Sequence, residues 1–269
     1  MAIDLRDRPL LITGASSGIG AATAVRAARA GMPVVVTARR LDRLERVAEE
    51  VRSAGGRAEA MSLDVTDAGA CAAAVARCDE AFGPPYAVLA NAGYGFDAPA
   101  HETTDEAMRA IFETNFYGTL NIVRASLPGM LEARAGHVLI TSSCVSKLAL
   151  PRFSAYTATK AAQNHIGRAM NLELRGTGVR ASTIHPVGTK TEFFDTAKTN
   201  SEPGNHSLGD HAPSWAMQSA DTVARAIVRC LRRPRSEVWP AWSPLVRIGM
   251  SICTAFPVLA DWGTKRLAK

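Results

Sequence analysis

The sequence predicts an α/β fold, with a single domain built on a doubly wound parallel sheet and helices on both faces. Short apolar runs alternate with amphipathic segments at intervals that suit βαβ units. The first, second, fifth and sixth runs are almost continuously apolar or β-branched, which is typical of strands covered on both faces. A glycine-rich turn joins the first run to the first helical segment. These observations favour a Rossmann-type architecture, and 269 residues are enough for one such domain with a sizeable core.

The expected elements follow one another along the chain. Strands are predicted at 9–13, 33–37, 57–62, 86–90, 136–141, 179–184 and 236–239. Helices are predicted at 18–30, 41–54, 67–82, 104–133, 154–175 and 219–232, with an irregularity in the fourth at Pro128. Gly31, Gly55 and Gly176 lie where helices should end.

Composition argues against several classes of protein. The chain is 47% hydrophobic and 21% charged, unlike a disordered or fibrous chain. Its net charge of +6 comes from Arg and Lys spread along the chain, so we expect no nucleic-acid partner. Five cysteines without a C-x-x-C pair are typical of reduced thiols, which favours a cytoplasmic protein. No metal motif is present, so we assign no metal. The chain enters its first strand almost directly, so we expect no signal peptide.

Residues 14–20, Gly-Ala-Ser-Ser-Gly-Ile-Gly, form the glycine-rich turn. Gly14 permits a sharp bend, Gly18 lets backbone approach a pyrophosphate, and Gly20 allows the helix to pack closely on the strand. The amino terminus of the following helix offers N–H groups and a positive dipole end to phosphates. A glycine turn by itself is common, but the strand before it and the helix after it indicate a nucleotide site.

A second pattern joins Tyr156 and Lys160, four residues apart, to Ser143, thirteen residues earlier. On a helix, positions i and i+4 share one face, so the phenol and the ammonium can point into one site. A nearby cation favours the phenolate and is expected to lower the tyrosine pKa. The same spacing is common on solvated helix faces, and it gains weight here from the independent nucleotide signal.

These features, with others in the right order, resemble the classical short-chain dehydrogenase/reductase family over about residues 8–240. The additional matches are Asp64-Val65 after the third predicted strand, Asn91-Ala92-Gly93 after the fourth, and Asn115 in the helix that follows. The family has the fold predicted above and transfers a hydride between a nicotinamide and a substrate carbon.

The resemblance implies a role for each catalytic residue. Tyr156 would be the general acid/base, and Lys160 would lower its pKa and bind the nicotinamide ribose. Ser143 would hold and polarise the substrate oxygen, with Ser142 as an alternative that the spacing does not favour. Asn115 would either anchor a water in a proton relay or simply bridge backbone groups. Separately, Cys144, His137 and His165 are expected to be structural.

The resemblance also implies a cofactor-binding set, which includes two of the catalytic residues. Its members are Gly14, Ser16, Ser17, Gly18, Ile19, Gly20, Arg39, Asp64, Val65, Asn91, Ala92, Gly93, Tyr156, Lys160, Pro186, Gly188, Thr189 and Thr191. One position departs from the family, which usually shows Pro-Gly where this chain has Pro186-Val187. The loop that meets the carboxamide is therefore expected to differ in geometry from the family's usual one.

The end of the second predicted strand bears on the choice of cofactor. It reads Ala38-Arg39-Arg40 and has no carboxylate, which would bind a ribose 2′-hydroxyl and repel a 2′-phosphate. Arg39 instead offers a planar fork of donors, and Ser16 adds a hydroxyl. Arg40 is expected to be a solvated neighbour. The sequence therefore predicts NADP(H).

The function predicted is an NADP(H)-dependent oxidoreductase that interconverts a carbonyl and a secondary alcohol on a fairly hydrophobic small molecule. The alternative is a non-catalytic NADP(H)-binding sensor or scaffold, which need not retain the complete catalytic set. We expect a homodimer or homotetramer in the cytoplasm.

Residues 1–243 are predicted to form the catalytic and cofactor-binding domain, and 244–269 an apolar helical extension. Leu245, Ile248, Ile252, Phe256 and Leu259 recur at near-helical spacing, as in a helix that packs on the domain or on a partner. The stretch is too short to span a bilayer, and membrane contact through the tail is possible but not favoured. The polar segment 195–211 is predicted to be a mobile lid.

Overall fold

The computed structural model describes residues 2–190, 217–240, 244–256, 258 and 261. Thr191 and the predicted lid at 195–211 lie outside them. Within these residues a seven-stranded sheet has the order β3-β2-β1-β4-β5-β6-β9, and every pairing in it is parallel. The strands are β1 (Leu10–Thr13), β2 (Val34–Ala38), β3 (Ala58–Ser62), β4 (Ala87–Ala90), β5 (Gly136–Thr141), β6 (Val179–Ile184) and β9 (Glu237–Val238). The predicted fold is confirmed, and each predicted strand matches within one residue.

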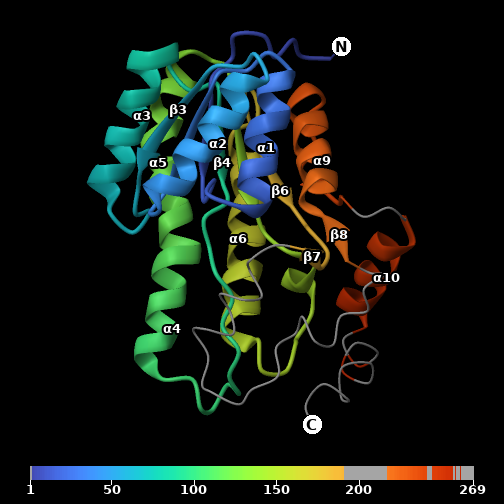
Figure 1. Ribbon diagram of the computed structural model, residues 1–269. Coiled ribbons are helices and arrows are strands. Elements are labelled where there is room, and N and C mark those ends of the chain that lie inside the picture. Colours follow the sequence, from blue (N-terminus) through green and yellow to red (C-terminus); the bar gives the residue numbers. More distant parts are fainter. Residues whose placement is uncertain (1, 191–216, 241–243, 257, 259–260, 262–269) are drawn as a thin grey trace.

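Helices cover both faces of this sheet (Figure 1). One face carries α1 (Gly18–Arg29), α2 (Leu41–Ser53) and α9 (Ala220–Arg232), and the other carries α3 (Ala68–Phe82), α5 (Gly118–Glu132) and α6 (Ser154–Glu173). In β1, Leu10 and Ile12 pack into the first layer, whereas Leu11 packs into the second. Because successive side chains of a strand point to opposite faces, two apolar layers require the uninterrupted apolar runs seen in the sequence.

The predicted helix over 104–133 is interrupted, but not at Pro128. It consists of α4 (Asp105–Phe112), a π-helical turn η1 (Glu113–Tyr117) and α5, which contains Pro128 without a break. The carbonyl of Asn115 accepts hydrogen bonds from Thr119 Oγ1 and Gln163 Nε2 instead of belonging only to the helix ladder. The bond from Gln163 on α6 supports the wider turn from outside the helix, and π-helical turns of this kind are frequent at functional sites.

Two short elements beside the sheet have no counterpart in the prediction. A 3₁₀ helix, η2 (Cys144–Lys147), follows β5 directly, and Ser143 caps it by accepting a hydrogen bond from the Val145 N–H at 3.3 Å. A small parallel pair joins β7 (Thr189–Lys190) to β8 (Gln218–Ser219). Both are too short for periodicity in the sequence to reveal them.

The carboxyl-terminal helix α10 (Pro244–Ala255) lies beside η2 at the right of Figure 1. Ile248, Ile252 and Phe256, which were expected to pack on the domain or on a partner, are 53%, 45% and 62% exposed. These three side chains are therefore not packed on the domain. No helix among the described residues combines the length and the apolarity needed to cross a bilayer.

Two fully buried histidines near the β5–β6 pair should make the protein sensitive to acid. Burial lowers the pKa of His137 to about 3 and that of His185 to about 4. An unfolded histidine titrates at about 6.5, so between that pH and about 4 the unfolded chain binds protons that the native one does not. The free energy of unfolding should therefore fall as pH falls through this window, by up to about 1.4 kcal/mol per pH unit for each histidine.

Urea denaturation at pH 7.5, 6 and 5 measures this slope. His137→Asn should flatten it even if the variant is less stable at pH 7.5, whereas substitution of the exposed His101 should not. An unchanged slope in His137→Asn would contradict the assignment.

Candidate functional site

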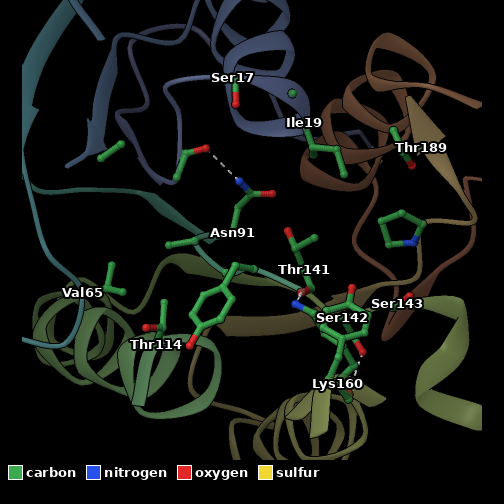
Figure 2. A pocket seen from close by; sticks show the side chains of 18 of the residues that line it. Ser17, Ile19, Val65, Asn91, Thr114, Thr141, Ser142, Ser143, Lys160 and Thr189 are labelled. Carbon is green, nitrogen blue, oxygen red and sulfur yellow. Dashed lines mark hydrogen bonds between the residues drawn. The ribbon is translucent and has the colours of Figure 1, made fainter. Parts of the chain in front are cut away.

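A cavity of about 600 Å³ opens at the carboxyl ends of the strands, where the strand order reverses between β1 and β4. In doubly wound folds this is where ligands bind. Seventeen of the predicted site residues line it: Gly14, Ser16, Ser17, Gly18, Ile19, Arg39, Asp64, Val65, Asn91, Ala92, Gly93, Ser143, Tyr156, Lys160, Pro186, Gly188 and Thr189. Figure 2 shows Ser17 and Ile19 facing Ser143 and Lys160 across the cavity, with Asn91 between them.

The glycine turn has the geometry that a bound pyrophosphate requires. Gly14 and Gly18 adopt positive φ angles of 64° and 59°. A Cβ on Gly14 would lie 2.8 Å from the Cα of Ala92, and one on Gly20 would lie 2.5 Å from the Gly14 carbonyl. Gly20 does not line the cavity but lets α1 approach the turn. Ser17 makes no side-chain capping bond, so the first N–H groups of α1 can bind phosphate oxygens.

Asn91 and Thr13 hold this turn against β4. The Asn91 carboxamide donates to the carbonyls of Thr13 and Gly14, both at 3.2 Å. Thr13 Oγ1 in return accepts from the N–H groups of Asn91 at 3.0 Å and Ala92 at 3.1 Å. The Asn-Ala-Gly motif therefore shapes the floor of the cofactor site.

Tyr156 and Lys160 project from the first turns of α6 towards Ser143 at the end of β5. Lys160 Nζ lies 5.6 Å from the centre of the Tyr156 ring and donates to the Thr141 carbonyl at 2.8 Å. Figure 2 shows this bond at the base of the cavity. The predicted constellation is thus brought together in space.

The sequence predicted a lowered pKa for Tyr156, and the structure contradicts this prediction. Burial raises the pKa of the Tyr156 phenol well above its ordinary value, although a hydrogen bond with Ser143 opposes the rise. Burial also lowers the pKa of Lys160 to about 7, so near neutral pH the amine is only partly charged. Desolvation therefore dominates both shifts. The phenol keeps its proton at neutral pH, as a proton donor must.

The geometry separates Ser143 from its neighbour Ser142. The Ser142 hydroxyl donates to the Lys160 carbonyl at 2.8 Å, and the residue is only 2% exposed. It therefore ties β5 to α6, whereas Ser143 interacts with Tyr156. Of the two alternatives, Ser143 is the hydroxyl that contacts Tyr156.

Asn115 lies behind the cavity wall and is fully buried. Its carboxamide donates to the Tyr94 carbonyl at 3.0 Å and to Thr159 Oγ1 at 3.1 Å, and accepts from the Tyr94 N–H at 2.9 Å. These bonds join η1 to the loop after β4 and to α6. The proton relay expected of Asn115 stays a prediction.

The arginine pair at the end of β2 lines the rim of the cavity. Arg40, expected to be solvated, donates to Ser16 Oγ at 3.1 Å, which places its guanidinium against the glycine turn. Across the rim, hydrogen bonds from Thr66 N and Oγ1 lower the pKa of Asp64, and the charge of Arg39 adds to this. Both arginines therefore place positive charge at this end of the cavity.

The loop after β6 borders the opposite end. Thr189 Oγ1 donates to the Val187 carbonyl at 2.7 Å, and Gln218 Nε2 donates to the same oxygen at 3.2 Å. The Cys144 N–H donates to the Pro186 carbonyl at 3.0 Å. The loop is thus well bonded despite Val187 at the family's glycine position.

Comparisons with known proteins agree with this geometry. The model of the short chain dehydrogenase family matches residues 8–202. The chain belongs to the short-chain dehydrogenase family. It is 37% identical to an uncharacterized oxidoreductase of Myxococcus xanthus over 70% of this chain and 75% of the relative. It is 33% identical to a fatty acyl-CoA reductase of Mycobacterium tuberculosis over 82% and 76%. A short chain dehydrogenase/reductase of Burkholderia phymatum, solved with NAD, superposes with a TM-score of 0.85 over 96% of both chains at 24% identity.

Sequence reasoning missed part of this dehydrogenase's cavity wall. Four residues that lie between Ser143 and Tyr156 in the sequence form an apolar part of the cavity lining: Cys144, Val145, Leu150 and Phe153. Burial raises the pKa of the Cys144 thiol to about 11, which agrees with a packing role. The apolar residues of the stretch 144–153 were the available signal. Other lining residues that were not predicted are Leu63, Tyr94, Thr114, Thr141 and Val187.

Proposed function

We propose that this dehydrogenase is an NADP(H)-dependent enzyme that interconverts a carbonyl and a secondary alcohol on an apolar small molecule. The observation that carries the proposal is the meeting of Ser143, Tyr156 and Lys160 in one cavity with the glycine turn. The bound nicotinamide cofactor supplies or accepts the hydride.

The chain's own residues handle the substrate oxygen and its proton. Ser143 Oγ donates a hydrogen bond to the carbonyl oxygen and holds it beside Tyr156. As the carbon gains the hydride, the Tyr156 hydroxyl gives its proton to that oxygen, and in the reverse direction takes it back. Lys160 stabilises the phenolate that remains and binds the nicotinamide ribose. Asn115 supports the relay that returns the proton.

Charge at the rim supports NADP(H). A 2′-phosphate would meet Arg39, Arg40 and Ser16, and the end of β2 carries no carboxylate to repel it. The remaining cofactor contacts we propose are those of the predicted set that line the cavity, together with Thr191, which lies outside the described residues.

The apolar wall supports an apolar substrate. Leu150 and Phe153 present hydrocarbon close to Ser143, and a binding pocket selects for what its walls can desolvate. The similarity to a fatty acyl-CoA reductase is in keeping with such a substrate. A non-catalytic sensor is the alternative. Such a protein has no need to bring Ser143, Tyr156 and Lys160 together in one cavity.

A substrate panel tests the proposal. Purified protein is incubated with NADPH and aldehydes or ketones of increasing chain length, and with NADP⁺ and the matching alcohols, while absorbance of NADPH is followed. We expect turnover that rises with apolar length. NADPH binding without turnover on any member would favour the sensor.

We further propose that residues 1–243 form the catalytic unit and that 244–269 carry a contact between copies of this chain. The five free cysteines favour the cytoplasm.

The double variant Ile252→Ser with Phe256→Ser should reduce the mass measured by light scattering, because polar side chains weaken an apolar interface. Leu41→Ser, an equally exposed leucine on α2, should leave the mass unchanged. An unaltered oligomer in the double variant would reject the interface.

A further inference from the structure

His185 follows β6 directly and is fully buried, outside the cavity lining. Its backbone N–H donates to the Val238 carbonyl at 2.8 Å, which fixes it to the edge strand β9. Its Nδ1 lies 3.1 Å from the carbonyl oxygen of Ser143. The imidazole therefore reaches across from β6 to the residue proposed to hold the substrate oxygen.

The partners of the ring determine its tautomer. A carbonyl oxygen can only accept, so Nδ1 must carry the proton that is donated to Ser143. Nε2 is then an acceptor, and the Thr183 hydroxyl lies 3.0 Å from it. Burial keeps the ring neutral at physiological pH by lowering its pKa to about 4. A neutral ring protonated on Nδ1 satisfies the contacts with Ser143 and Thr183, and the Ser146 hydroxyl, 3.4 Å from Nδ1, can accept from the same N–H.

Further contacts hold the same segment. The ring stacks on Trp239, with centroids 4.6 Å apart and planes 11° from parallel. At the far end of η2, Lys147 donates to Glu237 at 3.2 Å, and both side chains are less than one-fifth exposed. Trp239 Nε1 donates to the same carboxylate at 3.4 Å. The η2 helix is thus fastened at both ends to β6 and β9.

We propose that His185 is a positioning residue for Ser143. By holding the Ser143 carbonyl, it fixes the orientation from which Ser143 Oγ meets Tyr156 and the substrate oxygen. Within η2 the Ser143 carbonyl also accepts from the Ser146 N–H at 3.1 Å, but that bond is local to the turn, whereas His185 ties the same carbonyl to β6. The inference rests on the proposed function, because it assigns His185 a part in the same reaction.

Two matched variants separate the hydrogen bond from the packing of the ring. His185→Phe keeps the stacking on Trp239 but donates nothing. His185→Asn loses the ring but can present its amide N–H where Nδ1–H was. We expect phenylalanine to lower kcat about tenfold, a part of the roughly hundredfold loss that a 1 Å misplacement can cause. Asparagine should stay within about threefold of the wild type, and KM for the cofactor should change little in both.

A double-mutant cycle with Ser143→Ala tests whether His185 acts through Ser143. The phenylalanine effect should disappear when the serine hydroxyl is absent. A tenfold loss that persists in the Ser143→Ala background overturns the inference, as does a phenylalanine variant with wild-type kcat or an asparagine variant that is worse than phenylalanine. If Ser143→Ala alone turns over normally, the proposed function fails instead.

Nitrogen NMR of the unaltered protein adds a test that needs neither folding of a variant nor turnover. The His185 resonances at pH 7 should report a neutral ring protonated on Nδ1. A ring protonated on Nε2, or on both nitrogens, overturns the inference.

Discussion

Tyr156→Phe is expected to lower kcat by about 10²- to 10⁴-fold while the Kd for NADPH changes little. The substitution keeps the aromatic ring but removes the hydroxyl that we propose gives the substrate its proton. Stopped-flow and steady-state kinetics of carbonyl reduction, with cofactor fluorescence for binding, measure the two quantities separately.

Tyr117→Phe is the matched control, because it removes a phenolic hydroxyl from a half-exposed tyrosine outside the cavity. It should react like the unaltered protein. If Tyr156→Phe did so as well, the phenol would not be the acid, and the role of the whole constellation would have to be reassigned.

Cofactor preference should move from NADPH towards NADH when Ala38 is replaced by Asp and Arg39 by Ser. Charged hydrogen bonds contribute about 1.5–3 kcal/mol each, so the loss of one phosphate contact corresponds to roughly ten- to a hundredfold in affinity. The new carboxylate adds repulsion of the 2′-phosphate. The ratio of kcat/KM values for the two cofactors, measured in both proteins, reports the change.

The structure adds Arg40→Ser to this comparison, since Arg40 touches Ser16 on the glycine turn. It should weaken NADPH and leave NADH nearly unaffected, whereas Arg46→Ser, on the exposed side of α2, should alter neither. Salt should also weaken NADPH more than NADH in the unaltered protein. Equal use of both cofactors by that protein would remove the NADP(H) assignment and leave the family assignment intact.

The fold was predictable because its signals are local. Four strands, β1, β2, β5 and β6, read as almost continuous apolar or β-branched runs, and Gly31, Gly55 and Gly176 follow the ends of α1, α2 and α6. The break in the long helix was misplaced for the opposite reason. Pro128 is a visible helix breaker, yet α5 accommodates it, while the turn at 113–117 depends on Gln163 and Thr159, almost fifty residues away. No property of residues 113–117 alone announces those partners.

The site divides in the same way. Spacing on a helix was enough to place Tyr156 beside Lys160, and motif order placed Ser143 opposite them. The direction of the Tyr156 pKa shift was not predictable, because desolvation belongs to the assembled pocket and not to any residue pair. The contact of Arg40 with Ser16 and the apolar wall at 144–153 likewise need the loops to be seen in place.

The π-helical turn at 113–117 changes which side of the continuous helix α4–η1–α5 faces the rest of the fold. Each residue of an α-helix turns the following side chains by about 100°, so one additional residue resets which side of the column faces inward. Below the turn α4 buries only Ile111, whereas above it α5 buries a full stripe against the sheet. In Figure 1 the two run end to end, with α4 extending past the sheet. The π-helical turn therefore changes the direction of the inward-facing side between α4 and α5. The buried stripe of α5 can therefore face the sheet while α4, which contributes no lining residue to the cavity, packs beside α6.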